Sequence, residues 1–453
     1  MEIPPHAGSG GGKKSGKLSW WQLSLIGVGC IIGTGYFLGS GIGIKMTGPS
    51  IILSFLLAGL GTYIVAEALA KMSAKDPQKG AFRSYAKKAF GPWAGFCTGW
   101  AFWFSELLIT GSQMTALSLL SRFWFEDVPL WIFSSIFAVL GIVVVLIGTK
   151  GFEKAQNLFA VIKIAAILMF IVLAITVMFG FFGGNQANIR IPDNTKELFP
   201  NGITGLWASL VFGFYAFGGI EIMGILATRL KKRDDAKKAA INTVVLLTII
   251  YIISLILVTS LTALDKFTTK ESPFVTALNP YDIHIFPHLF IGGIIIAGFS
   301  TMSASLFAVT SMIVTLAKDG DAPKLFSKKG KLKVPPFALF LTIGGVLASI
   351  ILGLLMPDRV YEYITTAAGL MLLYNWFFVL IAFPRIIKAS GFDHVKRFTG
   401  MGLILLAISG TLLKDSSRPG FFVSILFIVL IVVVLLIINA VKKRKKGLEP
   451  QRT

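Results

Sequence analysis

Two long apolar segments of this chain are each broken by closely spaced glycines, first at Gly33 and Gly35 and again at Gly218 and Gly219. A glycine inside a helix costs about 1 kcal/mol relative to alanine. In lipid, unwound backbone persists only where protein or a water-filled cavity provides hydrogen-bond partners. Paired breaks in the two halves of a membrane protein are typical of a transporter's substrate site. The glycines therefore predict a polar site inside a bundle of membrane helices.

Close packing of helices is the alternative explanation of these glycines. Gly29 and Gly33, like Gly35 and Gly39, have the spacing that lets two membrane helices approach closely. The second cluster, at the matching position of the other half, favours a substrate site. A dinucleotide-binding fingerprint does not fit, because the glycine spacing differs and no βαβ pattern surrounds it.

Composition places the chain among integral membrane proteins. Apolar residues make up 55% of the 453 positions and charged residues 14%, and the mean hydropathy is +0.77. The net charge is +21, but the basic residues are dispersed over short loops, which disfavours nucleic-acid binding. Cys30 and Cys97 both lie in apolar segments, which disfavours a disulfide framework or a metal site.

Apolar runs between charged loops predict an all-α membrane protein with twelve transmembrane helices. The predicted spans are 20–43, 49–71, 91–119, 128–149, 155–181, 202–227, 239–263, 286–316, 335–356, 361–384, 396–413 and 420–441. The basic loops all fall on one side of such a bundle, and that side is expected to be cytoplasmic. The sequence thus predicts a multi-pass protein of the cell membrane with both termini in the cytoplasm.

The two breaks fall in the first and sixth predicted spans, so the second unit enters the membrane from the opposite face. This predicts a 5+5 inverted repeat, about residues 19–181 and 202–384, followed by two extra helices. The expected organisation is a disordered cytoplasmic tail at 1–18, a ten-helix transport core at 19–385, accessory helices at 386–441 and a basic cytoplasmic tail at 442–453.

Broken helices expose backbone groups that can bind charges. The half-helix that begins near Gly35 directs free N–H groups and a positive dipole end into the membrane midplane, which suits a carboxylate. Half-helices that end near Ile31 and Phe217 leave free carbonyls, which suit an ammonium group. Opposite charges held by backbone a short distance apart match the head group of an α-amino acid.

A series of short motifs runs in order along residues 19–385. They include Ile32-Gly33-Thr34-Gly35-Tyr36-Phe37, Gly80-Ala81-Phe82-x-x-Tyr85, Ile162-Lys163-Ile164, Phe217-Gly218-Gly219-Ile220-Glu221 and Leu316 to Pro323. On these motifs the chain resembles bacterial amino acid permeases of the amino acid–polyamine–organocation superfamily. The resemblance implies a leucine-transporter-type fold with broken helices 1 and 6, and transport by alternating access.

The resemblance also implies roles for single residues. Thr34 and Gly35 would hold the substrate carboxylate, and the carbonyls of Ile31, Tyr215 and Gly218 would hold its amino group. The Tyr215 ring would close over the bound substrate, unless it is an ordinary aromatic of a packed helix. The predicted substrate-binding set is Ile31, Gly33, Thr34, Gly35, Tyr215, Phe217, Gly218 and Gly219.

Lys163 lies within a predicted span, about 12 Å from its cytoplasmic end. Ionisable residues inside a membrane are costly and are functional candidates by default. Burial disfavours the charged ammonium, so Lys163 is predicted to load and release a proton. The similar lysine of the family occupies the place of a sodium ion in sodium-coupled relatives, which favours proton coupling. A permanently charged structural lysine is the alternative.

Polar residues of two further spans are expected to complete a core network. Ser300, Thr301 and Ser303 would offer hydroxyls near Lys163, and Glu221 lies just past the second break. A structural pairing is the alternative for Glu221. Glu67, near the end of the second span, is expected to be structural or gating.

Departures from the family pattern leave specificity open. Gln113 stands where many relatives have a glutamate, Glu106 stands at a position that is usually neutral, and Arg229 stands where an acidic residue is common. Apolar neighbours favour an uncharged substrate, while Glu106 keeps a cationic one open. These neighbours are Leu107, Leu108, Ile220 and Met223.

The sequence predicts a secondary active transporter that imports a neutral amino acid together with a proton. No phosphate-binding Gly-x-x-x-x-Gly-Lys motif and no catalytic set of side chains stands out, so an enzyme is not expected. The predicted partners are an amino acid, a proton and the lipid bilayer, without a cofactor, metal ion, nucleic acid or obligate subunit. An amino acid or amine exchanger or exporter of the same fold is the alternative, and an ion channel is a remote one.

Overall fold

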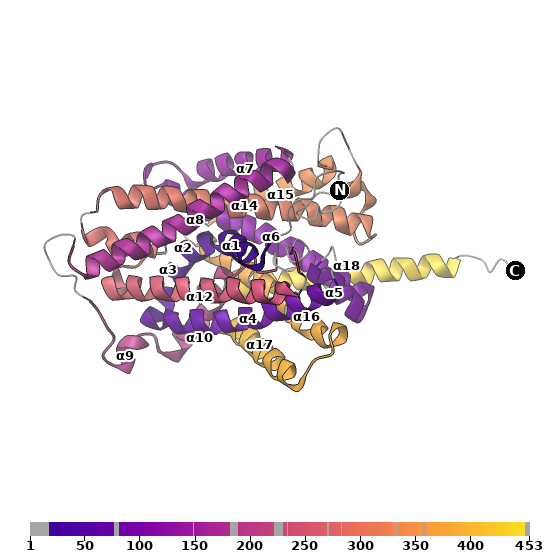
Figure 1. Cartoon of the computed structure of the whole chain (residues 1–453). Coiled ribbons are helices and arrows are strands. Elements are labelled where there is room, and N and C mark those ends of the chain that lie inside the picture. The colour runs from indigo at the N-terminus through magenta and orange to yellow at the C-terminus, as the bar shows by residue number, and fades with distance from the viewer. Residues whose placement is uncertain are drawn as a thin grey trace.

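Long helices that run side by side along one direction build the protein, as the computed structural model shows (Figure 1). The structure describes residues 18–76, 81–147, 149–181, 189–221, 230–232, 234–269, 271–281, 283–328, 330, 334–356 and 359–448. Within them, the only strand-like pairing is an isolated bridge between Leu18 and Leu230. The predicted all-α class is therefore confirmed for the described part of the chain.

The α-helices overlap every predicted span, and three short helices, at 81–90, 195–198 and 273–278, lie between predicted spans. Their bounds are α1 Trp20–Ile31, α2 Thr34–Phe37, α3 Gly39–Thr47, α4 Ile51–Lys75, α5 Ala81–Phe90, α6 Pro92–Ser121, α7 Leu130–Ile147, α8 Thr149–Met178, α9 Thr195–Leu198, α10 Gly202–Ala216, α12 Asp235–Leu261, α13 Pro273–Leu278, α14 Ile285–Lys318, α15 Pro336–Leu355, α16 Val360–Ile386, α17 Gly391–Gly410 and α18 Arg418–Leu448. Helical residues occupy every one of the predicted spans.

Seven helical stretches of the described chain are long and apolar enough to cross a bilayer. They are Thr34–Lys75, Leu130–Ile147, Leu158–Met178, Asp235–Leu261, Ile285–Lys318, Val360–Ile386 and Arg418–Val441, with shorter apolar helices at Trp20–Ile31 and Pro336–Leu352. The 30-residue α6 is not among them. Its interior carries Glu106 and Gln113 along with several hydroxyls, which a helix surrounded by other helices tolerates better than one facing lipid.

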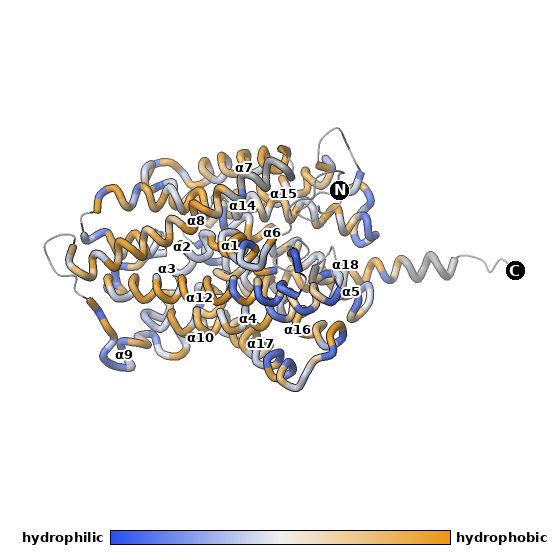
Figure 2. The backbone as a smooth tube through the Cα atoms, viewed as in Figure 1, coloured by the Kyte–Doolittle hydropathy of each residue, from blue (hydrophilic) through white to orange (hydrophobic). Residues whose placement is uncertain are grey.

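Hydrophobic and hydrophilic residues are distributed unevenly along the length of the helices. Figure 2 shows orange, hydrophobic stretches along most of the bundle and blue, hydrophilic segments concentrated toward the helix ends. This distribution is the one that a bilayer selects, because apolar side chains face hydrocarbon and charged ones reach water.

The most extensive contacts between distant parts of the chain involve α6 and α4. The central α6 packs against α14 and α16, while α4 packs against α12 and α10. Helix α1 lies between α8 and α12, and α3 lies against α10. The first helix and the helix that starts the second predicted repeat are thereby brought to the same interior region.

Candidate functional site

The first predicted break is present in the structure. Helix α1 ends at Ile31, and α2 begins at Thr34 after Gly33, whose backbone is extended. The Gly33 carbonyl accepts hydrogen bonds from the amides of Tyr36 at 3.0 Å and Phe37 at 3.1 Å. The amides of Thr34 and Gly35 have no hydrogen-bond partner among the described residues, as expected for the first turn of a helix.

The second break begins where α10 ends at Ala216, and residues 217–221 form turns. Gly219 has φ +103°, a conformation that favours glycine. Its amide donates to Oε2 of Glu221 at 3.1 Å, so this carboxylate binds the backbone within the break. Residues 222–229 lie outside the described part, and with them Met223 and Arg229.

The two breaks lie against each other. A Cβ atom placed on Gly35 would stand 2.8 Å from Cε1 of Tyr215, and one placed on Gly219 would stand 3.5 Å from Cγ1 of Ile31. Contacts this close require glycine at position 35, because any side chain would displace the phenol ring. The structure therefore brings together backbone of both breaks and the Tyr215 ring.

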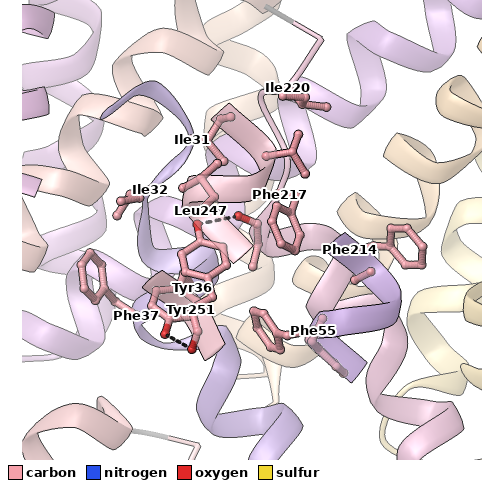
Figure 3. Close-up of a cluster of buried hydrophobic side chains, with 14 of the residues drawn as sticks. Ile31, Ile32, Tyr36, Phe37, Phe55, Phe214, Phe217, Ile220, Leu247 and Tyr251 are labelled. Carbon is pink, nitrogen blue, oxygen red and sulfur yellow. Dashed lines mark hydrogen bonds between the residues drawn. The ribbon is translucent and has the colours of Figure 1, made fainter. Parts of the chain in front are cut away.

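A cluster of buried aromatic side chains packs beside the two breaks (Figure 3). The Tyr36 and Tyr251 rings stack with centroids 3.8 Å apart, and the Phe217 ring lies 5.2 Å from that of Tyr251. The Tyr251 hydroxyl donates to the Ala216 carbonyl at 3.0 Å, which satisfies one of the free carbonyls at the end of α10. The Phe217 side chain is fully buried and packs in the core, and its proposed substrate-binding role stays a prediction.

Helices α6 and α16 contact the first break through side chains. The Thr34 hydroxyl donates to Oε1 of Gln113, and the Tyr361 hydroxyl donates to the Thr34 carbonyl at 3.3 Å. Sequence reasoning missed Tyr251 and Tyr361. Tyr251 stands alone in an apolar run, which packing explains equally well, and Tyr361 is one of two tyrosines that flank Glu362 at the start of a predicted span.

Lys163 is 1% exposed and lies beside the first break. Its Nζ donates to Oγ1 of Thr301 at 3.2 Å, and that same oxygen would be 2.8 Å from a Cβ on Gly33. Lys163, Thr301 and Gly33 therefore form a continuous contact from α8 through α14 to the break. Thr301 holds the place that the sequence predicted for it.

The other members of the predicted polar network lie apart from this contact. Ser300 exchanges hydrogen bonds with Gln156 of α8, through its hydroxyl at 2.6 Å and its carbonyl at 2.9 Å. The Ser303 hydroxyl is buried without a hydrogen-bond partner among the described residues. No hydrogen bond in the described part links Glu221 to Ser300 or Thr301, so the predicted residues form separate groups.

Two buried carboxylates accompany the second break. Glu106 of α6 is 8% exposed and Glu221 is 5% exposed, so both carboxyl groups are buried. Neither has a basic partner among the residues that the structure describes. The Tyr215 hydroxyl, also buried, has no hydrogen-bond partner there. Buried polar groups without partners are candidates for ligand contacts.

The apolar neighbours that favoured an uncharged substrate are only partly at the site. Leu108 shares a buried cluster with Tyr215, and Ile220 is 1% exposed in the core. Leu107 points instead toward α15, where its Cδ1 would be 2.4 Å from a Cβ on Gly345.

A second polar centre, away from the breaks, joins two of the family-like motifs. The Arg83 side chain, which is almost fully buried, pairs with Asp319 at 2.6 Å and Asp321 at 2.5 Å. Its Nε donates to the Gly95 carbonyl at 3.2 Å. This guanidinium ties α5 to the segment at the end of α14.

Comparison with known proteins identifies the family. The amino acid permease family model matches residues 22–449. The chain is 54% identical over 414 residues to the uncharacterized transporter YcgH of Bacillus subtilis, covering 91% of this chain and 93% of the relative. It is 32% identical to the aromatic amino acid transport protein AroP of Corynebacterium glutamicum, covering 80% of this chain and 79% of the relative.

A third relative is the probable threonine/serine transporter YbxG of Bacillus subtilis. It is 26% identical, with 90% of this chain and 91% of the relative covered. These matches extend over nearly the whole chain and confirm the resemblance that the motifs indicate. This protein is a multi-pass membrane protein that belongs to the amino acid permease family.

Proposed function

We propose that this protein is a secondary active transporter of the cell membrane that imports a neutral amino acid together with a proton. The observation that carries the proposal is the contact between the two breaks, at Gly35 with Tyr215 and at Gly219 with Ile31. The aromatic and threonine/serine substrates in the names of two relatives support an uncharged substrate.

In this proposal, backbone groups of the two breaks bind the carboxylate and the ammonium group of the amino acid. The free amides of Thr34 and Gly35 bind the carboxylate, helped by the positive end of the helix that continues through α3. Carbonyls of Ile31, Tyr215 and Gly218 bind the ammonium group. The Tyr215 carbonyl already accepts the Gly218 amide at 3.0 Å, and its second lone pair remains for the substrate. The Tyr215 ring then covers the bound molecule.

Proton coupling is assigned to Lys163. When charged, its ammonium holds Thr301 and, through it, the backbone at Gly33. When the proton leaves, that hold weakens, and the first break gains freedom to rearrange. The proton site and the substrate site would therefore be coupled through a single hydroxyl contact.

The topology proposed for this cycle has twelve spans, with a 5+5 inverted repeat, two accessory helices and both termini in the cytoplasm. The observed helices are consistent with it, because each predicted span overlaps at least one described helix. Alternating access would rock one group of helices against the other around the breaks.

Uptake by the purified protein in liposomes tests the proposal. With an inward proton gradient we expect saturable, stereoselective accumulation of an uncharged amino acid, which collapses when a protonophore is added. Counterflow without any gradient, combined with no response to pH, would assign the exchanger alternative instead. Currents that far exceed turnover-limited transport would assign a channel.

A further inference from the structure

A pocket between α4, α16 and α17 lies outside the proposed transport site. Its lining includes Ile64, Glu67, Lys71, Phe383, Lys396 and Arg397. Figure 1 shows α17 at the lower edge of the bundle, beside α4 and α10. The pocket is therefore formed where an accessory helix meets the core.

Positive charge exceeds negative charge in this pocket. The Glu67 carboxylate is 4% exposed and has three ammonium groups around it, from Lys71 at 3.1 Å, Lys237 at 2.9 Å and Lys396 at 2.7 Å. Lys71 also pairs with Asp393 at 2.6 Å. Ammonium groups gathered on one carboxylate repel one another, and a further anion would offset that repulsion.

Arg397 supplies a donor for such an anion. Its Nε is buried and has no hydrogen-bond partner among the described residues. With Arg397 included, four cations face the two carboxylates of Glu67 and Asp393. A guanidinium N–H left unpaired beside this excess charge is suited to a phosphate oxygen.

Apolar surface beside these cations indicates where the anion comes from. The apolar part of the pocket lining is formed by Ile64, Ala68, Leu380 and Phe383. The outer face of α17 carries Phe392, Val395 and Phe398, which are 68%, 62% and 60% exposed. The Arg397 guanidinium lies 4.5 Å from the centroid of the Phe398 ring and the Lys396 ammonium 4.7 Å from that of Phe392. Cations beside exposed aromatic rings are typical of a helix end at the membrane surface.

We propose that this pocket binds the phosphate of an anionic phospholipid headgroup, with Arg397 and Lys396 as its main contacts. Basic pockets between membrane helices on the cytoplasmic side bind such headgroups. The lipid would supply the missing negative charge, and it would fasten α17 to α4 and, through Lys237, to α12. The site is independent of the substrate and proton sites proposed above.

Native mass spectrometry of the full-length protein in a neutral detergent tests this site. Phosphatidylglycerol should be retained on the protein, and phosphatidylcholine much less. Arg397→Gln should reduce phosphatidylglycerol retention about five-fold, the factor expected for one cation near a lipid surface. Arg397→Lys should retain most of the binding because it keeps the charge. Lys232→Gln, an exposed residue outside the pocket, should leave it unchanged.

Thermal unfolding supplies the second arm and reports on folding of each variant. Phosphatidylglycerol should raise the unfolding temperature of the wild type more than that of Arg397→Gln, while inorganic phosphate or glycerol 3-phosphate should not reproduce the effect. Equal stabilisation by a free phosphate would assign a soluble anion to the pocket and overturn the headgroup. Equal retention of both lipids, or of phosphatidylglycerol by wild type and Arg397→Gln, would overturn the site itself.

Discussion

The ring of Tyr215 lies against the α-carbon of Gly35, so closely that a Cβ atom on Gly35 would stand 2.8 Å from Tyr215 Cε1. This contact joins the first broken helix to the second across a long stretch of sequence. Because the ring is held within a buried cluster, it has little room to yield. The shape of the proposed substrate site depends on a hydrogen atom at that position.

Gly35→Ala should therefore lower uptake about five-fold or more, since overpacking a buried contact costs roughly 1–3 kcal/mol. Uptake by the variant in liposomes measures the effect, and size-exclusion profiles report whether it folds. Gly344→Ala is a matched control, because a Cβ there meets open space. Normal uptake by Gly35→Ala would show that the two breaks need not stay in contact.

Lys163→Ala should separate binding from energy coupling. The substitution removes the ammonium that holds Thr301 but leaves the backbone groups proposed for the head group. We expect counterflow exchange to persist and gradient-driven accumulation to be lost. Lys196→Ala, an exposed residue of α9, serves as the control. Full accumulation by Lys163→Ala would remove the lysine from the coupling mechanism.

Tyr251→Phe tests the support behind the second break. The substitution leaves the buried Ala216 carbonyl without its donor at 3.0 Å, which costs about 1–3 kcal/mol. The apparent unfolding temperature and the substrate affinity should both fall. Tyr374→Phe is the control. It removes the α16 hydroxyl that pairs with Ser424 of α18, and it should leave substrate affinity unchanged. Equal effects of both variants would refute a specific role for Tyr251.

Glu106→Gln tests whether the substrate is uncharged. A neutral side chain makes no ion pair with Glu106, so affinity for an uncharged amino acid should change less than about three-fold. A loss of ten-fold or more, together with competition by lysine or arginine against the wild type, would assign a cationic substrate.

The breaks were predictable because glycine inside an apolar run has few structural explanations. The side chains that form hydrogen bonds with the breaks could not be predicted from the sequence. Tyr251 bonds a carbonyl 35 residues away and Tyr361 bonds one 327 residues away, so only the fold brings them together. Ser300 and Thr301 are adjacent in sequence, yet about 100° of helix rotation directs the first to Gln156 and the second to Lys163.

The boundaries of the helices were also only partly predictable from the sequence. The first predicted span, 20–43, is three helices: its interruption at Gly33 was predicted, but the further one at Leu38, between α2 and α3, was not. Helix α17 begins at Gly391, five residues before the predicted span, because Ser390 caps it with its hydroxyl accepting the Asp393 amide. Hydropathy detects apolar length and does not register a polar first turn.

That polar first turn makes stability dependent on pH. The hydrogen bond from Lys71, at 2.6 Å, and those from the Ser390 amide and hydroxyl hold the pKa of Asp393 at about 2, below its ordinary value of 3.8. A carboxyl whose pKa falls on folding stabilises the protein while it is ionised. Its contribution is complete above pH about 4 and disappears as the pH falls toward 2.

Thermal unfolding of wild type and Asp393→Asn between pH 7 and pH 2 measures this contribution. The wild type should unfold at the higher temperature above pH about 4, and the difference should shrink to zero through the window below it. Asp415→Asn is the control, because that carboxyl is 91% exposed, and its curve should follow the wild type throughout. A constant offset between wild type and Asp393→Asn at every pH would mean that the Asp393 charge does not hold the start of α17 to α4.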